Sequence, residues 1–159
     1  MRTLMRSIMV GSALLAVVPV THIAAQANPF VGTWKMDVSK WKGTSGQAPN
    51  SVTVKMEQAG AMLKVNVAVV GSDGKATNQS YTMAYDGKDY PVTGSADYDM
   101  TSAKMLDPMT RHTVRKMGGK EVQTVHSVLS ADGKHYTATT TGVNAKGEKI
   151  HTTAVYDKQ

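Results

Sequence analysis

Short runs of alternating apolar and polar side chains fill the chain from about residue 51 to its end, and each run stops at a turn signal. In Leu63–Val69, for example, apolar side chains occupy every second position. This period of two indicates a strand with one buried face. Pairs such as Asp86-Gly87 and Gly118-Gly119 separate the runs and favour tight hairpins. No segment after residue 27 has the periodicity of a useful amphipathic helix.

The pattern therefore predicts about ten strands. They are expected near residues 31–37, 51–58, 62–70, 76–85, 89–93, 99–106, 111–117, 121–130, 135–141 and 150–157. Consecutive antiparallel hairpins form a meander, and closing the meander into a barrel removes the exposed sheet edges. We expect an all-β, antiparallel up-and-down barrel formed by a single domain, residues 28–159.

The first expected strand lies in Asn28–Asp37 and contains the triplet Gly32-Thr33-Trp34. Gly32 leaves room beside the indole ring of Trp34, so we expect this ring to close one end of the barrel. The next segment, Lys40–Asn50, is rich in turn-forming residues and predicts a loop. Trp41 within it either covers a barrel mouth or is a partly buried loop aromatic.

The first 27 residues have the composition of a secretory signal peptide. Arg2 and Arg6 precede an apolar run from Ile8 to Val20, and Ala25-Gln26-Ala27 fits a signal-peptidase site. The apolar run is shorter than the roughly 20 residues that span a bilayer. We expect cleavage after Ala27, a periplasmic or secreted protein, and no stable membrane insertion after cleavage.

The exported domain is expected to be held together by its core, because the sequence has no cysteine and hence no disulfide. The formal net charge is +6, of which the leader contributes two charges. The remaining basic residues are dispersed, so no nucleic-acid partner is expected. The sequence leaves the oligomeric state open, with a monomer as the default.

Four segments resemble the small secreted bacterial lipocalin-like (calycin-type) proteins, which are mostly uncharacterised. They are Gly32-Thr33-Trp34, Tyr85–Gly94, Ser130–Lys134 and Val155–Gln159, and Tyr85–Gly94 is the most specific of them. The resemblance covers nearly all of residues 28–159. It implies a barrel with a cavity and a small apolar or amphipathic ligand, although fold alone does not transfer function. The chain departs from the family pattern at Arg111–Met117, where the resemblance implies alternate apolar residues.

A two-residue turn at Gly118-Gly119 predicts that Arg111 faces His126 and that Arg115 faces Val122. A three-residue loop at Ala131–Gly133 predicts that Val128 faces Tyr136. One sheet face would then combine cationic and polar residues: Arg111, Thr113, Arg115, Thr124, His126, Val128 and Tyr136.

That face has two possible orientations. If it points inward, Arg111 and Arg115, assisted by His126, form a clamp for a carboxylate or phosphate. If it points outward, it is a solvated basic ladder. Unpaired charges inside a barrel cost several kcal/mol, which favours the outward or mouth-lining orientation. For the inward case, the apolar body of a ligand is expected to lie among Val65, Val67, Tyr81, Tyr85, Val128 and Tyr136.

No catalytic, metal or cofactor motif is present. The histidines after residue 27 lack metal-ligand spacing, and His126 and Ser127 are adjacent on a strand, so they face opposite sides. The leading hypothesis is a carrier of a small apolar or amphipathic molecule. The alternative is an interaction or inhibitory module with a filled barrel, and an enzyme comes third. A pocket of a few hundred Å³ would favour the carrier.

Overall fold

The computed structural model describes residues 28–44 and 46–159, and every regular element in them is a strand. The ten strands are β1 (Gly32–Gly43), β2 (Ser51–Ala59), β3 (Met62–Val70), β4 (Ala76–Met83), β5 (Tyr90–Pro91), β6 (Met100–Asp107), β7 (Thr110–Met117), β8 (Lys120–Leu129), β9 (His135–Val143) and β10 (Lys149–Lys158). The described residues contain no helix long and apolar enough to cross a membrane. The predicted leader, residues 1–27, lies outside the described residues.

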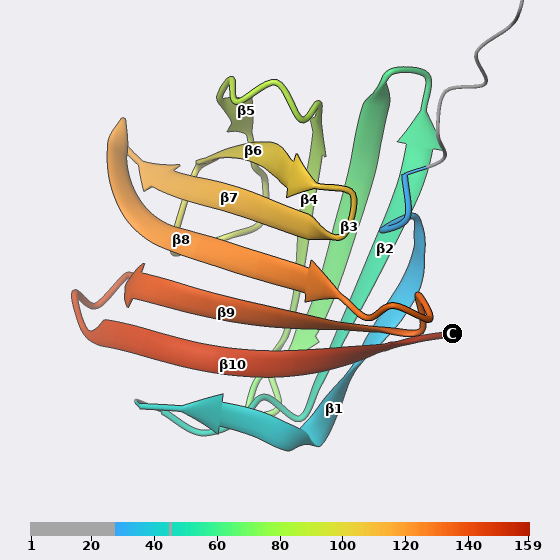
Figure 1. Cartoon of the computed structure of the whole chain (residues 1–159). Coiled ribbons are helices and arrows are strands. Elements are labelled where there is room, and N and C mark those ends of the chain that lie inside the picture. Colours follow the sequence, from blue (N-terminus) through green and yellow to red (C-terminus); the bar gives the residue numbers. More distant parts are fainter. Residues whose placement is uncertain (1–27, 45) are drawn as a thin grey trace, which may run out of the picture.

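The strands form one antiparallel sheet in the order β4-β3-β2-β1-β10-β9-β8-β7-β6-β5. Strands that follow one another in the chain pair as hairpins, except β4 and β5, which lie at opposite ends of this order. β1 pairs with β10 as well as with β2. Figure 1 shows β7 to β10 crossing in front of β2 to β4, with β1 bending between the two layers. The predicted all-β, up-and-down architecture is confirmed.

The barrel closes along a short seam between β4 and the segment that follows β5. Ser80 N–H donates to Thr93 O and Thr93 N–H donates to Ser80 O, both at 3.0 Å. Gly94 follows with a φ of +79°, and a Cβ atom at this position would overlap the carbonyl oxygen of Asn78. The close approach of the two backbones therefore requires glycine here.

Strand β1 is longer than predicted, because it continues through Lys40–Gly43, which was expected to be loop. A bulge between Asp37 and Lys42 bends the strand, and the second half pairs only with β10. Bulges bend a strand without ending it. Trp41 is partly buried, packs against the core and lies over Gly43.

Trp34 lies fully buried at the end of the barrel where β1 begins. Its indole N–H donates to Phe30 O at 2.9 Å, and its ring meets the Tyr136 ring edge-on at a centroid distance of 4.9 Å. The ammonium of Lys158 lies 5.1 Å from the indole ring. A Cβ atom at Gly32 would meet the Lys158 side chain at 2.8 Å, so Gly32 makes room for this lysine.

The register between β7 and β8 differs from the prediction over most of its length. Near the turn, Lys116 faces Glu121, in the register that a two-residue turn at Gly118-Gly119 gives, but a bulge at Val122 shifts the pairing by one residue beyond it. Arg115 faces Gln123, Thr113 faces Val125, and Arg111 faces Ser127. A shift of one residue turns every later side chain of a strand to the other face.

Ser130 and His135 form the last pair of the β8–β9 hairpin, so its loop is the four residues Ala131–Lys134 rather than three. Ser130 N–H donates to His135 O at 2.8 Å, and Asp132 Oδ1 accepts hydrogen bonds from Ser130 Oγ and Lys134 N. The carboxylate of Asp132 thus stabilises the longer loop. As a result Leu129, and not Val128, faces Tyr136.

Replacing Gly94 with Ala tests the seam, and Gly74→Ala is a matched control. Both glycines have a φ of +79°, but a Cβ atom at Gly74 meets nothing within 4 Å. Gly74→Ala should lower the free energy of unfolding by about 1–2 kcal/mol, the cost of the left-handed backbone. Gly94→Ala should cost about 2 kcal/mol more, because the two seam hydrogen bonds are also disturbed. Urea denaturation measures both, and equal losses would show that the seam contributes nothing.

Candidate functional site

The interior of the barrel contains a cavity of about 140 Å³. Inward-facing residues of seven strands, β2 to β4 and β7 to β10, line it. The apolar part of the lining is Val54, Met56, Val67, Val125 and Ala138, and the polar part is Tyr81, Arg111, Arg115, Ser127, Tyr136, Thr140 and Tyr156. The lining therefore combines apolar surface with two guanidinium groups and five hydroxyl groups.

Arg111 on β7 is 8% exposed and reaches across the barrel. Its Nη1 lies 3.3 Å from the sulfur of Met56 on β2, and its Nη2 lies 3.5 Å from Ser127 Oγ. The guanidinium carbon lies 4.7 Å from the centroid of the Phe30 ring. Its Nε is buried and has no hydrogen-bond partner among the described residues. These contacts are weak for a buried cation, which ordinarily has a carboxylate beside it.

Arg115 lies two inward positions further along β7 and is held more firmly. Its Nη1 donates to Gln123 Oε1 at 3.0 Å, and Gln123 Nε2 donates in turn to Val143 O at 3.1 Å. The guanidinium carbon lies 4.4 Å from the centroid of the Tyr98 ring, whose hydroxyl donates to Gln79 Oε1 at 2.5 Å. Gln123 and Tyr98 thus fix the position of this guanidinium.

The described residues provide no anion for either arginine. None of their carboxylates lies within ion-pairing distance of Arg111 or Arg115. Burial raises the pKa of Tyr156 to about 12 and also raises the pKa values of Tyr136 and Tyr81, so these phenols are neutral at physiological pH. The cavity therefore carries two positive charges that no described side chain neutralises.

The residues predicted for a ligand site fall into three groups. Arg111, Arg115, Val67, Tyr81 and Tyr136 line the cavity. Val65 is buried in the core but is not part of the lining, and Tyr85 lines a different hollow. His126 and Val128 face outward, where Val128 is 42% exposed.

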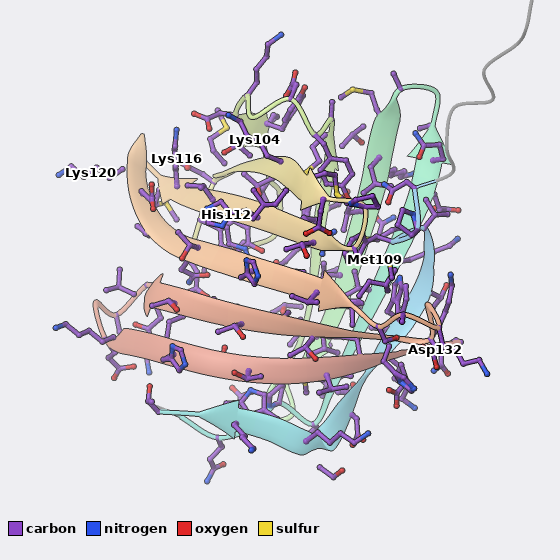
Figure 2. The ribbon with its side chains drawn as sticks, in the orientation of Figure 1. Lys104, Met109, His112, Lys116, Lys120 and Asp132 are labelled. Carbon is purple, nitrogen blue, oxygen red and sulfur yellow. The ribbon has the colours of Figure 1, made fainter. Side chains whose placement is uncertain are left out.

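The bulge at Val122 explains the exclusion of His126 and Val128, because it turns them away from the face of Arg111. It brings Val125 and Ser127 inward instead, and neither was predicted. The favoured outward or mouth-lining orientation of this face is wrong for Arg111, which is enclosed. Arg115 is partly exposed and lines the cavity. His112, between them on β7, lies on the outer surface opposite His126 (Figure 2).

One feature of the sequence signals the bulge. Gly142 lies inside β9 with a φ of +145°, and a Cβ atom there would overlap the carbonyl oxygen of Val122. A glycine inside a strand often marks a bulge or a close backbone approach. The sequence gives no comparable signal for Tyr156, Thr140 or Gln123, which depend on the pairing of distant strands.

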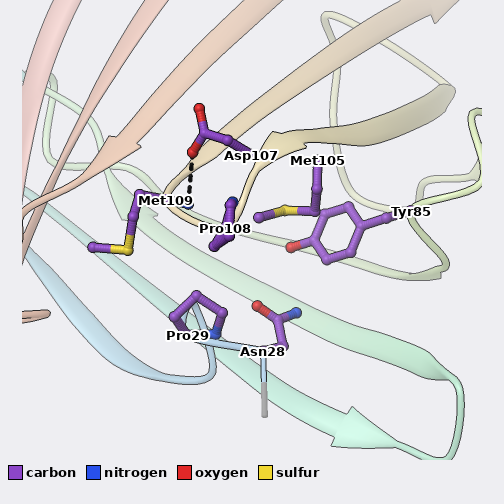
Figure 3. Close-up of a pocket in the computed structure, with 7 residues that line it drawn as sticks. All are labelled: Asn28, Pro29, Tyr85, Met105, Asp107, Pro108 and Met109. Carbon is purple, nitrogen blue, oxygen red and sulfur yellow. Dashed lines mark hydrogen bonds between the residues drawn. The ribbon is translucent and has the colours of Figure 1, made fainter. Parts of the chain in front are cut away.

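A second hollow of about 430 Å³ lies at the end of the barrel near the β6–β7 turn. It is lined by Asn28, Pro29, Tyr85, Met105, Asp107, Pro108 and Met109 (Figure 3). Its carboxylate is already engaged, because Asp107 Oδ1 accepts a hydrogen bond from Met109 N at 2.8 Å. Within residues 28–44 and 46–159, no group of three or more His, Asp or Glu side chains is placed to hold a metal ion.

Replacing Arg111 with Met should leave the free energy of unfolding unchanged or raise it. The substitution removes a buried charge that lacks a counter-ion, and an apolar residue of similar length fills the space. Arg115→Met is the contrasting variant and should lose about 1–3 kcal/mol, because the buried Gln123 amide loses its donor. Guanidinium chloride denaturation measures both variants. A loss of 3 kcal/mol or more for Arg111→Met would mean that its charge is well compensated.

Raising the pH from 10 to 12 should destabilise the protein. Over this window Tyr156 ionises in the unfolded chain, where its pKa is about 10, but stays neutral in the barrel, where its pKa is about 12. The contribution of Tyr156 to the free energy of unfolding is therefore fully present below pH 10. It falls by about 3 kcal/mol as the pH rises to 12. Tyr156→Phe should flatten the dependence in denaturation curves collected across the window. An unchanged slope would show that Tyr156 ionises normally.

No protein-family model and no curated protein matches the sequence. Among solved structures, the chain is similar to the siderocalin Ex-FABP, described as functioning through dual ligand specificities. The two chains share 13% identity over 82% of this chain and 71% of that one, with a TM-score of 0.40. A likeness this distant bears on neither ligand nor site, so the function has to be inferred from the cavity itself.

Proposed function

We propose that the barrel binds a small organic anion in its interior, with the anionic group at Arg111 and Arg115. The observation that carries this proposal is the pair of guanidinium groups lining one cavity without a carboxylate among the described residues. An anionic ligand would supply the missing charge. Arginine suits carboxylates because its planar fork donates two parallel hydrogen bonds.

Arg111 is the stronger candidate for direct contact with the anion. Its present partners are a thioether sulfur and a hydroxyl at 3.5 Å, whereas Arg115 already donates to Gln123 at 3.0 Å. Arg111 is already desolvated in the folded protein, so ligand binding does not have to remove its water. Charge-assisted hydrogen bonds to a ligand are strong in such a poorly solvated site. The hydroxyl groups of Tyr81, Tyr136 and Tyr156 make no hydrogen bond to a described residue and add potential donors.

The apolar part of the lining supports an organic anion over an inorganic one. Val54 and Val67 come from the strands that face β7 across the interior, and an apolar group packed there leaves water. With the signal peptide predicted at residues 1–27, the proposed function is that of an exported binding protein, either periplasmic or secreted.

The interior cavity is smaller than the few hundred Å³ that would favour a general carrier, and only the hollow near the β6–β7 turn, which neither arginine lines, has that volume among the pockets described above. The modest volume of the interior cavity keeps the filled-barrel alternative, a module that acts through its outer surface, as the competing function. The two functions differ in one respect: only an interior binding site requires Arg111.

Calorimetric titration with butyrate and its uncharged isostere butyramide tests the proposal. Butyrate should bind at least tenfold more tightly than butyramide, because a charge-assisted hydrogen bond contributes about 1.5–3 kcal/mol. Arg111→Met should weaken butyrate binding by about 10- to 150-fold. Lys120→Met is the control, since it removes one positive charge from the exposed β7–β8 end, where Figure 2 shows Lys120 projecting.

Loss of affinity in Arg111→Met with no loss in Lys120→Met would support the interior site. Equal affinity for acid and amide in all three proteins would contradict it. In that case the filled-barrel alternative would be preferred.

A further inference from the structure

We infer that the anion is a carboxylate whose apolar body is a single six-membered ring, about the size of benzoate. This inference rests on the proposed function and specifies its ligand class. Three features of the cavity carry it: its volume, its limits along the barrel axis, and the positions of its hydrogen-bond donors relative to its valines.

The volume sets the size of the body. A cavity of about 150 Å³ lined by apolar side chains is large enough to bind benzene, and this cavity measures about 140 Å³. A two-carbon acid would leave most of the apolar wall without contacts, and such a void forfeits dispersion energy. A long acyl chain requires more space than the cavity offers.

The side chains that bound the cavity along the axis exclude a chain that threads the barrel. At one end, Arg111 reaches from β7 to Met56 on β2, with Phe30 packed against its guanidinium. Toward the other end, the ring of Tyr98 lies on Arg115 and is itself only 3% exposed. A compact body fits between these limits, and an extended chain does not.

The walls set the orientation of the ligand. The guanidinium of Arg111 reaches across the barrel, so the donors for a carboxylate lie between Ser127 on β8 and Met56 on β2. Val54 on β2 faces Val67 on β3, one inward position along β2 from Met56. A ring carboxylate matches this arrangement, with its head at Arg111 and its body against the valines. Inorganic phosphate would match the donors but leave the valines uncovered.

The test is a calorimetric comparison of benzoate, cyclohexanecarboxylate, acetate and dodecanoate on the full-length protein and on Arg111→Met. Only affinity that is lost in Arg111→Met is assigned to the interior site. We expect the two ring acids to bind at least tenfold more tightly than acetate and dodecanoate. If dodecanoate binds as tightly as the ring acids or more tightly, and this binding depends on Arg111, the inference of a ring-sized ligand is overturned while the proposed function stands. Absence of Arg111-dependent binding for all four acids would overturn both.

Two further variants test the volume directly. Ala138→Leu places three additional carbon atoms in the cavity and should weaken benzoate binding at least tenfold, and by more than it weakens acetate binding. Ala68→Leu makes the same change at an exposed position of β3 and should leave both affinities unchanged. If Ala138→Leu fails to fold, Val67→Ala serves instead, because it enlarges the cavity and should admit 2-naphthoate. Unchanged benzoate binding in Ala138→Leu, or no gain for 2-naphthoate in Val67→Ala, would contradict the ring-sized site.

Discussion

The pairing of the first strand with the last is the constraint on which the rest of the structure depends. β1 is hydrogen-bonded to β2 on one side and to β10 on the other, and the Ser80–Thr93 bridge joins the two remaining edges. Closure gives every strand an inside and an outside, so alternation along β7 decides which of its side chains leave water. Arg111 and His112 are neighbours in the chain, yet one is enclosed and the other lies on the surface.

Closure of the barrel also explains why Arg111 and Arg115 indicate a ligand site. A guanidinium on an open sheet would remain hydrated, and its presence would say little about function. Inside the barrel the same group has lost its water. The described residues give Arg111 a sulfur, one distant hydroxyl, aromatic faces and the neighbouring Tyr85 phenol, but no carboxylate. Such an arrangement is unfavourable for folding alone. Its retention in a core built around Trp34 and Tyr136 is most simply explained by a ligand that supplies the anion.

Local patterns predicted much of the fold but not the composition of the site. The ten strands and their hairpins followed from alternation and from turns such as Gly118-Gly119, because these signals are local. One bulged residue, Val122, determines which side of β8 faces inward. β8 also carries apolar residues on both faces, with Val128 on one and Val125 on the other. Alternation therefore could not decide between them. The position of Tyr156 in the cavity depends on the β9–β10 pairing combined with barrel closure, which no short stretch of sequence encodes.

The most direct measurement is the ¹⁵N–¹H spectrum of the arginine Nε–Hε groups, recorded with and without benzoate. Arg111 and Arg115 are the only arginines after residue 27, so their signals can be assigned with Arg111→Lys and Arg115→Lys variants. Our account predicts that both signals shift on addition of benzoate and that Arg111, whose Nε has no partner among the described residues, shifts more. Benzoate binding that leaves both Nε–Hε signals unchanged would contradict an anion site at these arginines.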